Sequence, residues 1–173
     1  MLPRIKRILY ATDLSPNSEY VLQYAINSAR HHSAELIVLH VAEKLPPTVK
    51  ALIGQHISDA KLKEILQDKM DYAKERIQKR IQALCEKEML RQELKIEKLI
   101  AAIEVVDGYP ADVILRKAEQ LDSDAIIMGT HGKGFLRHSY FGSTAKKVLR
   151  RVRKPVFIIP LPEGETDVTF HDQ

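Results

Sequence analysis

Two patterns of hydrophobic positions alternate along the chain. Short runs that are apolar at consecutive positions and rich in β-branched residues predict strands at 5–12, 36–41, 99–106, 125–128 and 156–159. Such runs are expected of strands covered on both faces, as in a parallel sheet. Segments with helical spacing lie between them, at 21–29, 110–121 and 144–152. This alternation predicts an α/β fold with right-handed crossovers and a doubly wound parallel sheet.

Residues 44–98 depart from the alternation, because they separate the second predicted strand from the third by far more than one helix. Pro46 and Pro47 are expected to bar regular structure at the start. Beyond Ser58 the apolar positions predict one long amphipathic helix, with a break near Ile57 and fraying after Cys85. We interpret the segment as an extended crossover, and the alternative is a protruding helix that covers a pocket or a partner.

The first and second helices carry start signals. Ser15 is placed to cap the first helix, with Pro16 as its first residue, and Pro110 opens the second. Together the patterns predict a single domain over 1–162, with a helical insert at about 44–98 and a polar tail at 163–173.

Composition narrows the class of protein. The chain has 173 residues, 45% of them hydrophobic and 29% charged, which allows a sizeable core. A single cysteine excludes an intrachain disulfide framework, and no apolar run reaches the ~18 residues of a membrane span. We therefore expect a cytoplasmic protein with no membrane segment. The histidines show no spacing typical of zinc ligands, so no metal site formed by the protein alone is predicted.

The segment from Gly129 to Thr144 is the most informative for chemistry. It leaves the fourth predicted strand, contains Gly132 and Gly142, and enters a helix that starts near Ser143. Glycines let the backbone approach a ligand closely, and a helix N-terminus offers unpaired N–H groups to a phosphate. The overlapping stretch 133–155 holds eight Lys or Arg and no Asp or Glu, which suggests an anionic partner.

Asp13 follows the first predicted strand and is the second candidate. Its carboxylate is placed to accept hydrogen bonds from a nucleotide's base or ribose, and the alternative is that it caps the next helix. In a sheet ordered 3-2-1-4-5 the strand order reverses between strands one and four, where ligands bind in open α/β sheets. Asp13 and Gly129 would then face each other across one crevice. No P-loop and no Gly-x-Gly-x-x-Gly after the first strand is present.

These residues resemble a known family. Gly129, Gly132, Gly142 and Ser143 fit the pattern Gly-x2-Gly-x9-Gly-Ser/Thr, and the stretches ILYATDLS, GYPADVILRKAEQLDSDAIIMGTHG and KPVFIIP accompany it. Outside the helical insert, residues 4–160 are similar to the nucleotide-binding branch of the universal stress protein family. The resemblance implies a five-stranded parallel sheet of order 3-2-1-4-5 between helices, Rossmann-like and of the adenine nucleotide alpha hydrolase type.

The resemblance also implies a ligand, ATP or the related ADP or AMP, with a divalent cation such as Mg²⁺ alongside. Asp13 would contact the adenosine, Val41 would meet the adenine through its backbone, and the glycine-rich segment would hold ribose and phosphates. The implied binding residues are Ala11, Thr12, Asp13, Val41, Met128, Gly129, His131, Gly132, Gly142, Ser143 and Thr144.

Family members usually dimerise, often through the last strand, here Val156 to Pro160. An apolar edge strand left uncovered gives dimerisation an independent motive. The leading interpretation is an ATP-binding switch or regulator of a stress response, acting on a protein client. No catalytic residue is assigned, because no base is visible except Asp13, and at most slow hydrolysis is expected.

Two other functions stay open. A nucleotide-independent interaction module would use the long helix of 44–98 as its binding surface. Nucleic-acid binding to the basic segment 133–154 is the least favoured, since aromatic residues are sparse there and no recognition motif is present.

Overall fold

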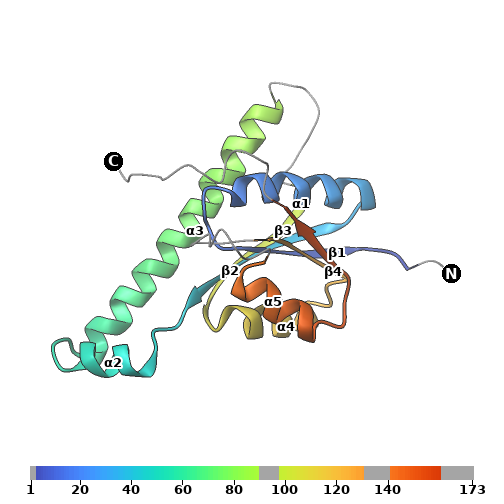
Figure 1. The fold of residues 1–173 in the computed structure, drawn as a ribbon. Helices are drawn as coiled ribbons and strands as arrows, with labels where there is room; N and C mark the ends of the chain where they lie inside the picture. The colour runs from blue at the N-terminus through green and yellow to red at the C-terminus, as the bar shows by residue number, and fades with distance from the viewer. Residues whose placement is uncertain (1–2, 90–97, 131–140, 161–173) are drawn as a thin grey trace.

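The computed structural model describes residues 3–89, 98–130 and 141–160. All five strands pair in parallel, in the order β3-β2-β1-β4-β5, which confirms the predicted fold class and strand order (Figure 1). The elements along the chain are β1 (Arg7–Thr12), α1 (Ser18–His32), β2 (Glu35–Glu43), α2 (Pro47–Gly54), α3 (Asp59–Met89), β3 (Ile100–Gly108), α4 (Pro110–Gln120), β4 (Ala125–Gly129), α5 (Ser143–Arg151) and β5 (Val156–Ile159).

The sheet is covered on both faces, as the consecutive apolar positions predicted. Within β1, Ile8 and Tyr10 join a core cluster with α1 and α3, whereas Leu9 joins the cluster with α4 and α5 on the other face. Because neighbouring side chains of a strand point to opposite faces, both faces of β1 are apolar. The central strand β1 is therefore buried. It lies beside β4, at the point where the strand order of the sheet reverses.

The first helix starts later than the sequence predicted. α1 begins at Ser18, its N-cap is Asn17, and no side chain caps it. Pro16 lies in a turn in which the Ser18 amide donates to the Ser15 carbonyl (3.1 Å). The prediction of Ser15 as N-cap and Pro16 as first helical residue is thus wrong, because Ser15 is held by Asp13 instead.

The segment 44–98 forms two helices. Pro47 opens α2 rather than barring regular structure, which corrects the sequence prediction: a proline at the first helical position has no N–H to satisfy. The chain then breaks at 55–58, as predicted, and α3 continues to Met89, so fraying after Cys85 is not found up to that residue. In Figure 1, α3 extends past the sheet, and α2 lies beyond the edge of the sheet, at the start of α3.

The two halves of α3 have different surroundings. The half near Met89 packs on the sheet through buried Ala73, Ile77, Ile81, Leu84 and Cys85. The half near Asp59 leaves Ile65 and Leu66 exposed. The predicted apolar stripe is therefore a core contact along only part of its length.

The remaining sequence predictions concern two helix starts, membrane segments and the polar tail. α4 begins at Pro110 and α5 at Ser143, as predicted. In the part of the chain that the structure describes, no helix is both long enough and apolar enough to span a membrane. The polar tail 163–173 lies outside the described residues.

Candidate functional site

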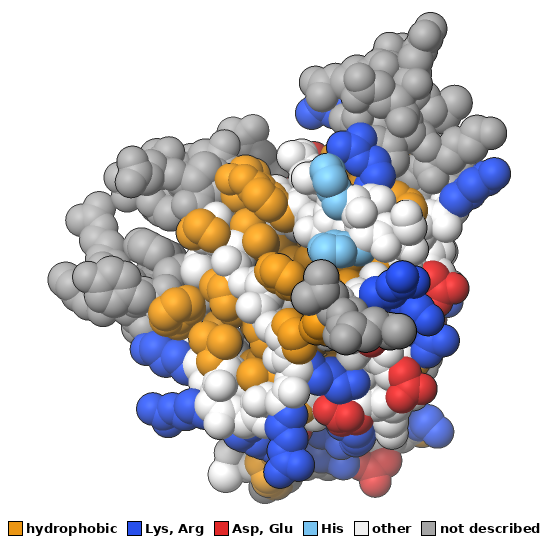
Figure 2. Space-filling view, turned by 90° about the vertical axis from the view of Figure 1, so that its right-hand side faces the viewer, with side chains coloured by type: hydrophobic (Ala, Val, Ile, Leu, Met, Phe, Trp, Pro, Cys, Tyr) orange, Lys and Arg blue, Asp and Glu red, His pale blue; other side chains and the backbone are white. Residues whose placement is uncertain are grey.

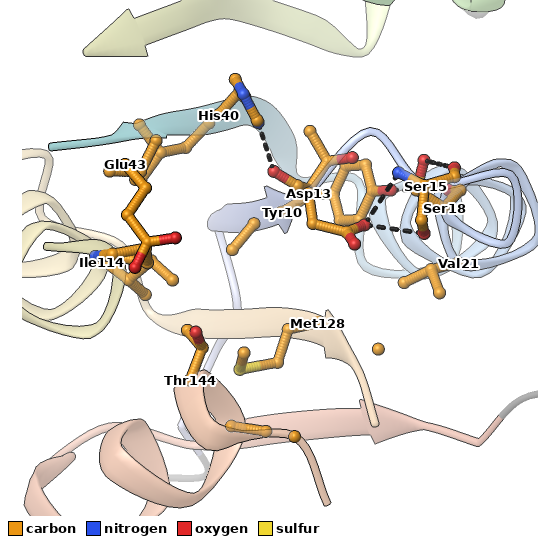
Figure 3. A pocket seen from close by; sticks show the side chains of 18 of the residues that line it. Tyr10, Asp13, Ser15, Ser18, Val21, His40, Glu43, Ile114, Met128 and Thr144 are labelled. Atoms are coloured by element: carbon orange, nitrogen blue, oxygen red, sulfur yellow. Dashed lines mark hydrogen bonds between the residues drawn. The ribbon is translucent and has the colours of Figure 1, made fainter. Parts of the chain in front are cut away.

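A cavity of about 490 Å³ opens at the carboxyl ends of the parallel strands, where the strand order reverses between β1 and β4. Its walls come from the ends of β1, β2 and β4, the loop before α1 and the first turn of α5. In Figure 3, Asp13, Ser15 and Ser18 lie on one side of the pocket, and Glu43, Ile114 and Thr144 lie on the other. This is the position at which open α/β sheets bind ligands.

Nine of the eleven residues singled out from the sequence line this one cavity. They come from three stretches far apart in the chain: Ala11, Thr12 and Asp13; Val41; and Met128, Gly129, Gly142, Ser143 and Thr144. The other two, His131 and Gly132, lie outside the described residues. The Gly142 amide donates to the Thr130 carbonyl (2.8 Å), which joins the end of β4 to the start of α5.

Asp13 has one carboxylate oxygen held and one without a partner. Its Oδ1 accepts hydrogen bonds from the Ser15 amide (3.1 Å) and the Ser15 hydroxyl (2.8 Å). Its Oδ2 is buried and has no hydrogen-bond partner among the described residues. The alternative role, capping the next helix, is not found, since α1 begins five residues later. A buried carboxylate oxygen without a donor is costly, so this atom is suited to accept a hydrogen bond from a ligand.

The backbone around Asp13 is tightly turned. Leu14 adopts a left-handed conformation with a φ of 61°, which a side chain other than glycine rarely takes. The Leu14 amide donates to Thr12 Oγ1 (3.2 Å), and the Thr12 carbonyl accepts from Nδ1 of buried His40 (2.8 Å). A carbonyl oxygen only accepts, so Nδ1 of His40 carries a proton. The second bond joins β1 to β2 through two residues that line the pocket.

The start of α5 faces the same cavity. Its N-cap is Gly142, which has no side chain to accept from the first-turn amides, and no side chain of the described residues caps the helix. The first N–H groups of a helix lack intrahelical partners and carry partial positive charge. Ser143 and Thr144 add hydroxyl groups beside them. The arrangement provides donors for an anionic ligand.

The sequence analysis missed several lining residues. The charged ones among the described residues are Glu43 at the end of β2 and Lys69 from α3, beside the expected Asp13. Extending β2 by two residues beyond Val41 would have found Glu43. No local signal pointed to Lys69, because its position depends on how α3 packs against the rest of the molecule. No cluster of three metal-ligating side chains occurs among the residues for which the structure gives positions.

Comparison with known proteins now decides the family. The family model described as the universal stress protein family matches residues 4–160. The chain belongs to this family. The matched region runs through 44–98, the segment that the sequence analysis had left out of the resemblance.

Individual relatives agree with this assignment. Universal stress protein MJ0577 of Methanocaldococcus jannaschii is 27% identical over 154 residues, covering 89% of this chain and 94% of the relative. The solved structure of MJ0577 superposes with a TM-score of 0.64 at 26% identity, covering 94% of this chain and all of that one. UspA from Lactobacillus plantarum has the same fold, with a TM-score of 0.68 at 23% identity over 91% of this chain and 99% of that one.

Proposed function

We propose that this universal stress protein binds an adenine nucleotide, ATP or the related ADP or AMP, in the pocket at the end of β1, β2 and β4. One observation carries the proposal: segments more than a hundred residues apart place an unsatisfied carboxylate oxygen and an uncapped helix N-terminus around one cavity. The cavity volume lies within the range typical of small-molecule sites.

The two ends of the pocket suit the two ends of a nucleotide. Asp13 Oδ2 accepts from a hydroxyl or amino group, as a ribose or an adenine ring supplies. The backbone of Val41, at the carboxyl end of β2, is placed to meet the base. The amides of α5 and the hydroxyls of Ser143 and Thr144 are suited to the phosphates.

A divalent cation such as Mg²⁺ fits the pocket only together with the nucleotide. Mg²⁺ usually binds through one or two carboxylates plus substrate phosphates, and the described lining contains the carboxylates of Asp13 and Glu43. We therefore propose that the cation arrives with the phosphates.

The pocket favours binding over catalysis. Phosphoryl transfer to water requires a group that orients the water and cations that stabilise the developing charge. Asp13 is the expected base, but its Oδ1 is already bound by Ser15 and its Oδ2 is assigned to the ligand. The proposed role is thus a nucleotide-dependent switch in a stress response, with turnover at most slow. A universal stress protein of the same fold, 19% identical with a TM-score of 0.52, has been solved in complex with cAMP.

Exchange of glycine for a larger residue at the pocket tests the proposal. Gly142→Val places a branched side chain at the N-cap of α5, so ATP affinity measured by calorimetry with Mg²⁺ should fall at least about tenfold. The matched control is Gly54→Val in α2, where an added Cβ meets nothing within 4 Å, and its affinity should stay within about twofold. A parent chain that binds no adenine nucleotide, or a Gly142→Val variant that binds like the parent, contradicts the proposal.

A homodimer through β5 is proposed as well. β5 is an edge strand with a 41% exposed Phe157, and it has a free side for pairing within the described chain. Hydrophobic side chains gather on the face of the molecule shown in Figure 2, with Lys and Arg below them and to their right. Phe157→Asp should convert the dimer to a monomer in sedimentation experiments, whereas a parent chain that is monomeric at all concentrations contradicts this arrangement.

A second candidate function rests on the exposed apolar residues of α2 and α3. Leu52 and Tyr72 are 62% and 61% exposed, which favours an interaction surface for a protein client. If the parent chain binds no adenine nucleotide while a client binds, this function replaces the first.

A further inference from the structure

One arginine connects the long helix α3 to the loop that carries Asp13. The Arg80 guanidinium donates to the Leu14 carbonyl (Nη2 to O, 3.2 Å) and to the Ser18 hydroxyl. These contacts join positions more than sixty residues apart in the chain. The pocket wall near Asp13 is formed by the end of β1 and the start of α1. Through Arg80, the separate helix α3 also supports this part of the site.

Hydrogen bonds continue from Arg80 to the Asp13 carboxylate. The Ser18 hydroxyl, which accepts from Arg80, donates to the Ser15 carbonyl (2.7 Å). Ser15 in turn donates from its amide and its hydroxyl to Asp13 Oδ1. Figure 3 shows Asp13, Ser15 and Ser18 adjacent to one another. Hydrogen bonds through Ser18 and Ser15 thus connect the guanidinium to the carboxylate.

Tyr10 of β1 also binds the end of this loop. Its hydroxyl donates to the Ser18 carbonyl (2.6 Å). Burial raises the pKa of Tyr10 to about 12, so the hydroxyl remains a donor at neutral pH. The loop is consequently held on one side by β1 and on the other by α3.

The loop needs this support because its backbone is strained. A left-handed conformation is unfavourable for a non-glycine residue, and Leu14 adopts one. Arg80 binds the carbonyl of this residue. The guanidinium is itself partly buried, and burial together with the neighbouring Arg76 lowers the pKa of Arg80. A partly buried cation requires hydrogen-bond acceptors, and the loop supplies them.

We propose that Arg80 is a positioning residue for the bound nucleotide, which fixes the loop 13–18 so that Asp13 is held ready for the ligand. The inference rests on the proposed function. It also makes α3 responsive to the ligand, because binding and the docking of α3 stabilise each other by the same free energy. Lys69 lines the pocket and lies eleven residues before Arg80, just over three helical turns, so both residues are on one side of α3.

ATP affinity of Arg80 variants is the first measurement. Arg80→Met keeps the aliphatic stem and removes the donors, so the dissociation constant should rise about tenfold. Arg80→Lys keeps the charge and one donor group and should recover part of the loss. The matched control is Arg76→Met, one turn earlier on the same helix, where the guanidinium stacks over Tyr72 (5.8 Å to the ring centroid). Its affinity should stay within about twofold.

A double-mutant cycle separates positioning from general destabilisation. If Arg80 acts through the Asp13 carboxylate, Arg80→Met should weaken binding by no more than about twofold in an Asp13→Asn background. An equal loss in both backgrounds overturns the inference, as does an Arg80→Met variant that binds like the parent. If Arg80→Met does not fold, Ser18→Ala interrupts the same path, and unchanged affinity in that variant overturns the inference.

Hydrogen exchange tests the positioning without any nucleotide. The Ser15 and Ser18 amides, both hydrogen-bonded within the loop, should exchange about tenfold faster in Arg80→Met and at the parent rate in Arg76→Met. Unchanged exchange in Arg80→Met overturns the inference even where ATP binds. A parent chain that binds no adenine nucleotide rejects the proposed function, and the exchange rates then decide whether Arg80 holds the loop.

Discussion

The two ends of the parallel sheet differ in the hydrogen bonding of their aspartate carboxylates. At the amino end, Asp124 Oδ2 accepts from the amides of Lys6 (2.7 Å) and Arg7 (2.9 Å) and ties β4 to β1. At the carboxyl end, Asp13 has an Oδ2 that is buried with no partner among the described residues. One carboxylate oxygen is thus bound by the backbone at one end, and one is left available at the other.

Other groups follow the same division. At the amino end, Lys154 Nζ donates to the carbonyls of Ala118 (3.0 Å) and Ser123 (2.8 Å). An exception there is the Ser123 hydroxyl, an uncharged group that is buried with no partner in the described chain. The carboxyl end contains the strained Leu14, the uncapped start of α5 and the cavity. Left-handed residues occur at both ends, since Ser33 and Asp122 precede β2 and β4 at the amino end. The difference between the ends is therefore the free oxygen of Asp13, the start of α5 and the cavity, which together can hold a ligand.

Removal of the Asp13 carboxylate should give the largest effect, and it tests whether the carboxyl end of the sheet serves the ligand. Asp13→Ala should weaken ATP binding about 100-fold, equivalent to about 2.7 kcal/mol, because charged hydrogen bonds to the ligand are lost. The free energy of unfolding should change by less than about 1 kcal/mol, since the lost bonds from Ser15 are offset by removal of a buried, unsatisfied oxygen.

Calorimetry and urea unfolding measure the two quantities on the same sample. Strong destabilisation of Asp13→Ala with unchanged affinity would mean that this carboxylate serves the fold, as Asp124 does, and that the two ends do not differ.

Removal of the negative charge at the amino end should give a smaller effect of the opposite kind. Asp124→Asn should lower the free energy of unfolding by about 1 kcal/mol at neutral pH and leave ATP affinity unchanged. The cause is the weakened pair of hydrogen bonds from the Lys6 and Arg7 amides.

The pH dependence sharpens this expectation. Hydrogen bonds from the backbone of Lys6 and Arg7 lower the pKa of Asp124 below its usual value. A carboxyl with a lowered pKa in the folded state stabilises the protein above the usual pKa of aspartate, and the contribution disappears as pH falls through the folded-state value. The difference between parent and Asp124→Asn should therefore be present at pH 7 and vanish in acid. A difference that persists at low pH contradicts this assignment.

The sequence predicted the strands well because their signal is local. Consecutive apolar residues in β1, β2 and β4 require burial on both faces, and only a covered parallel sheet provides it. The helix starts were predicted less well. Ser15 has a side chain typical of an N-cap, but its hydroxyl donates to the carboxylate of Asp13, two residues before it. The sequence offers both local motifs and does not show which of them forms.

The candidate site divides in the same manner. Asp13 and the Gly129–Ser143 stretch carry local signals, since a carboxylate or a glycine directly after a buried strand lies at the ligand-binding edge. Lys69 and Arg80 carry none, because each reads as one more cation on the polar face of an amphipathic helix. Only the packing of α3 against β2, β3 and α1 brings Lys69 to the pocket and Arg80 to the loop after β1.

The sequence by itself therefore determined the order of the strands and of the helices other than α2, the apolar faces, and Asp13 and the glycine-rich segment as the site, because periodicity and residue type act over a few neighbouring positions. The tertiary structure decided which oxygen of Asp13 stays unpartnered, that α3 extends past the sheet, and that Arg80 reaches Leu14. These properties depend on distances between segments joined only by folding, and such distances leave no trace in local sequence.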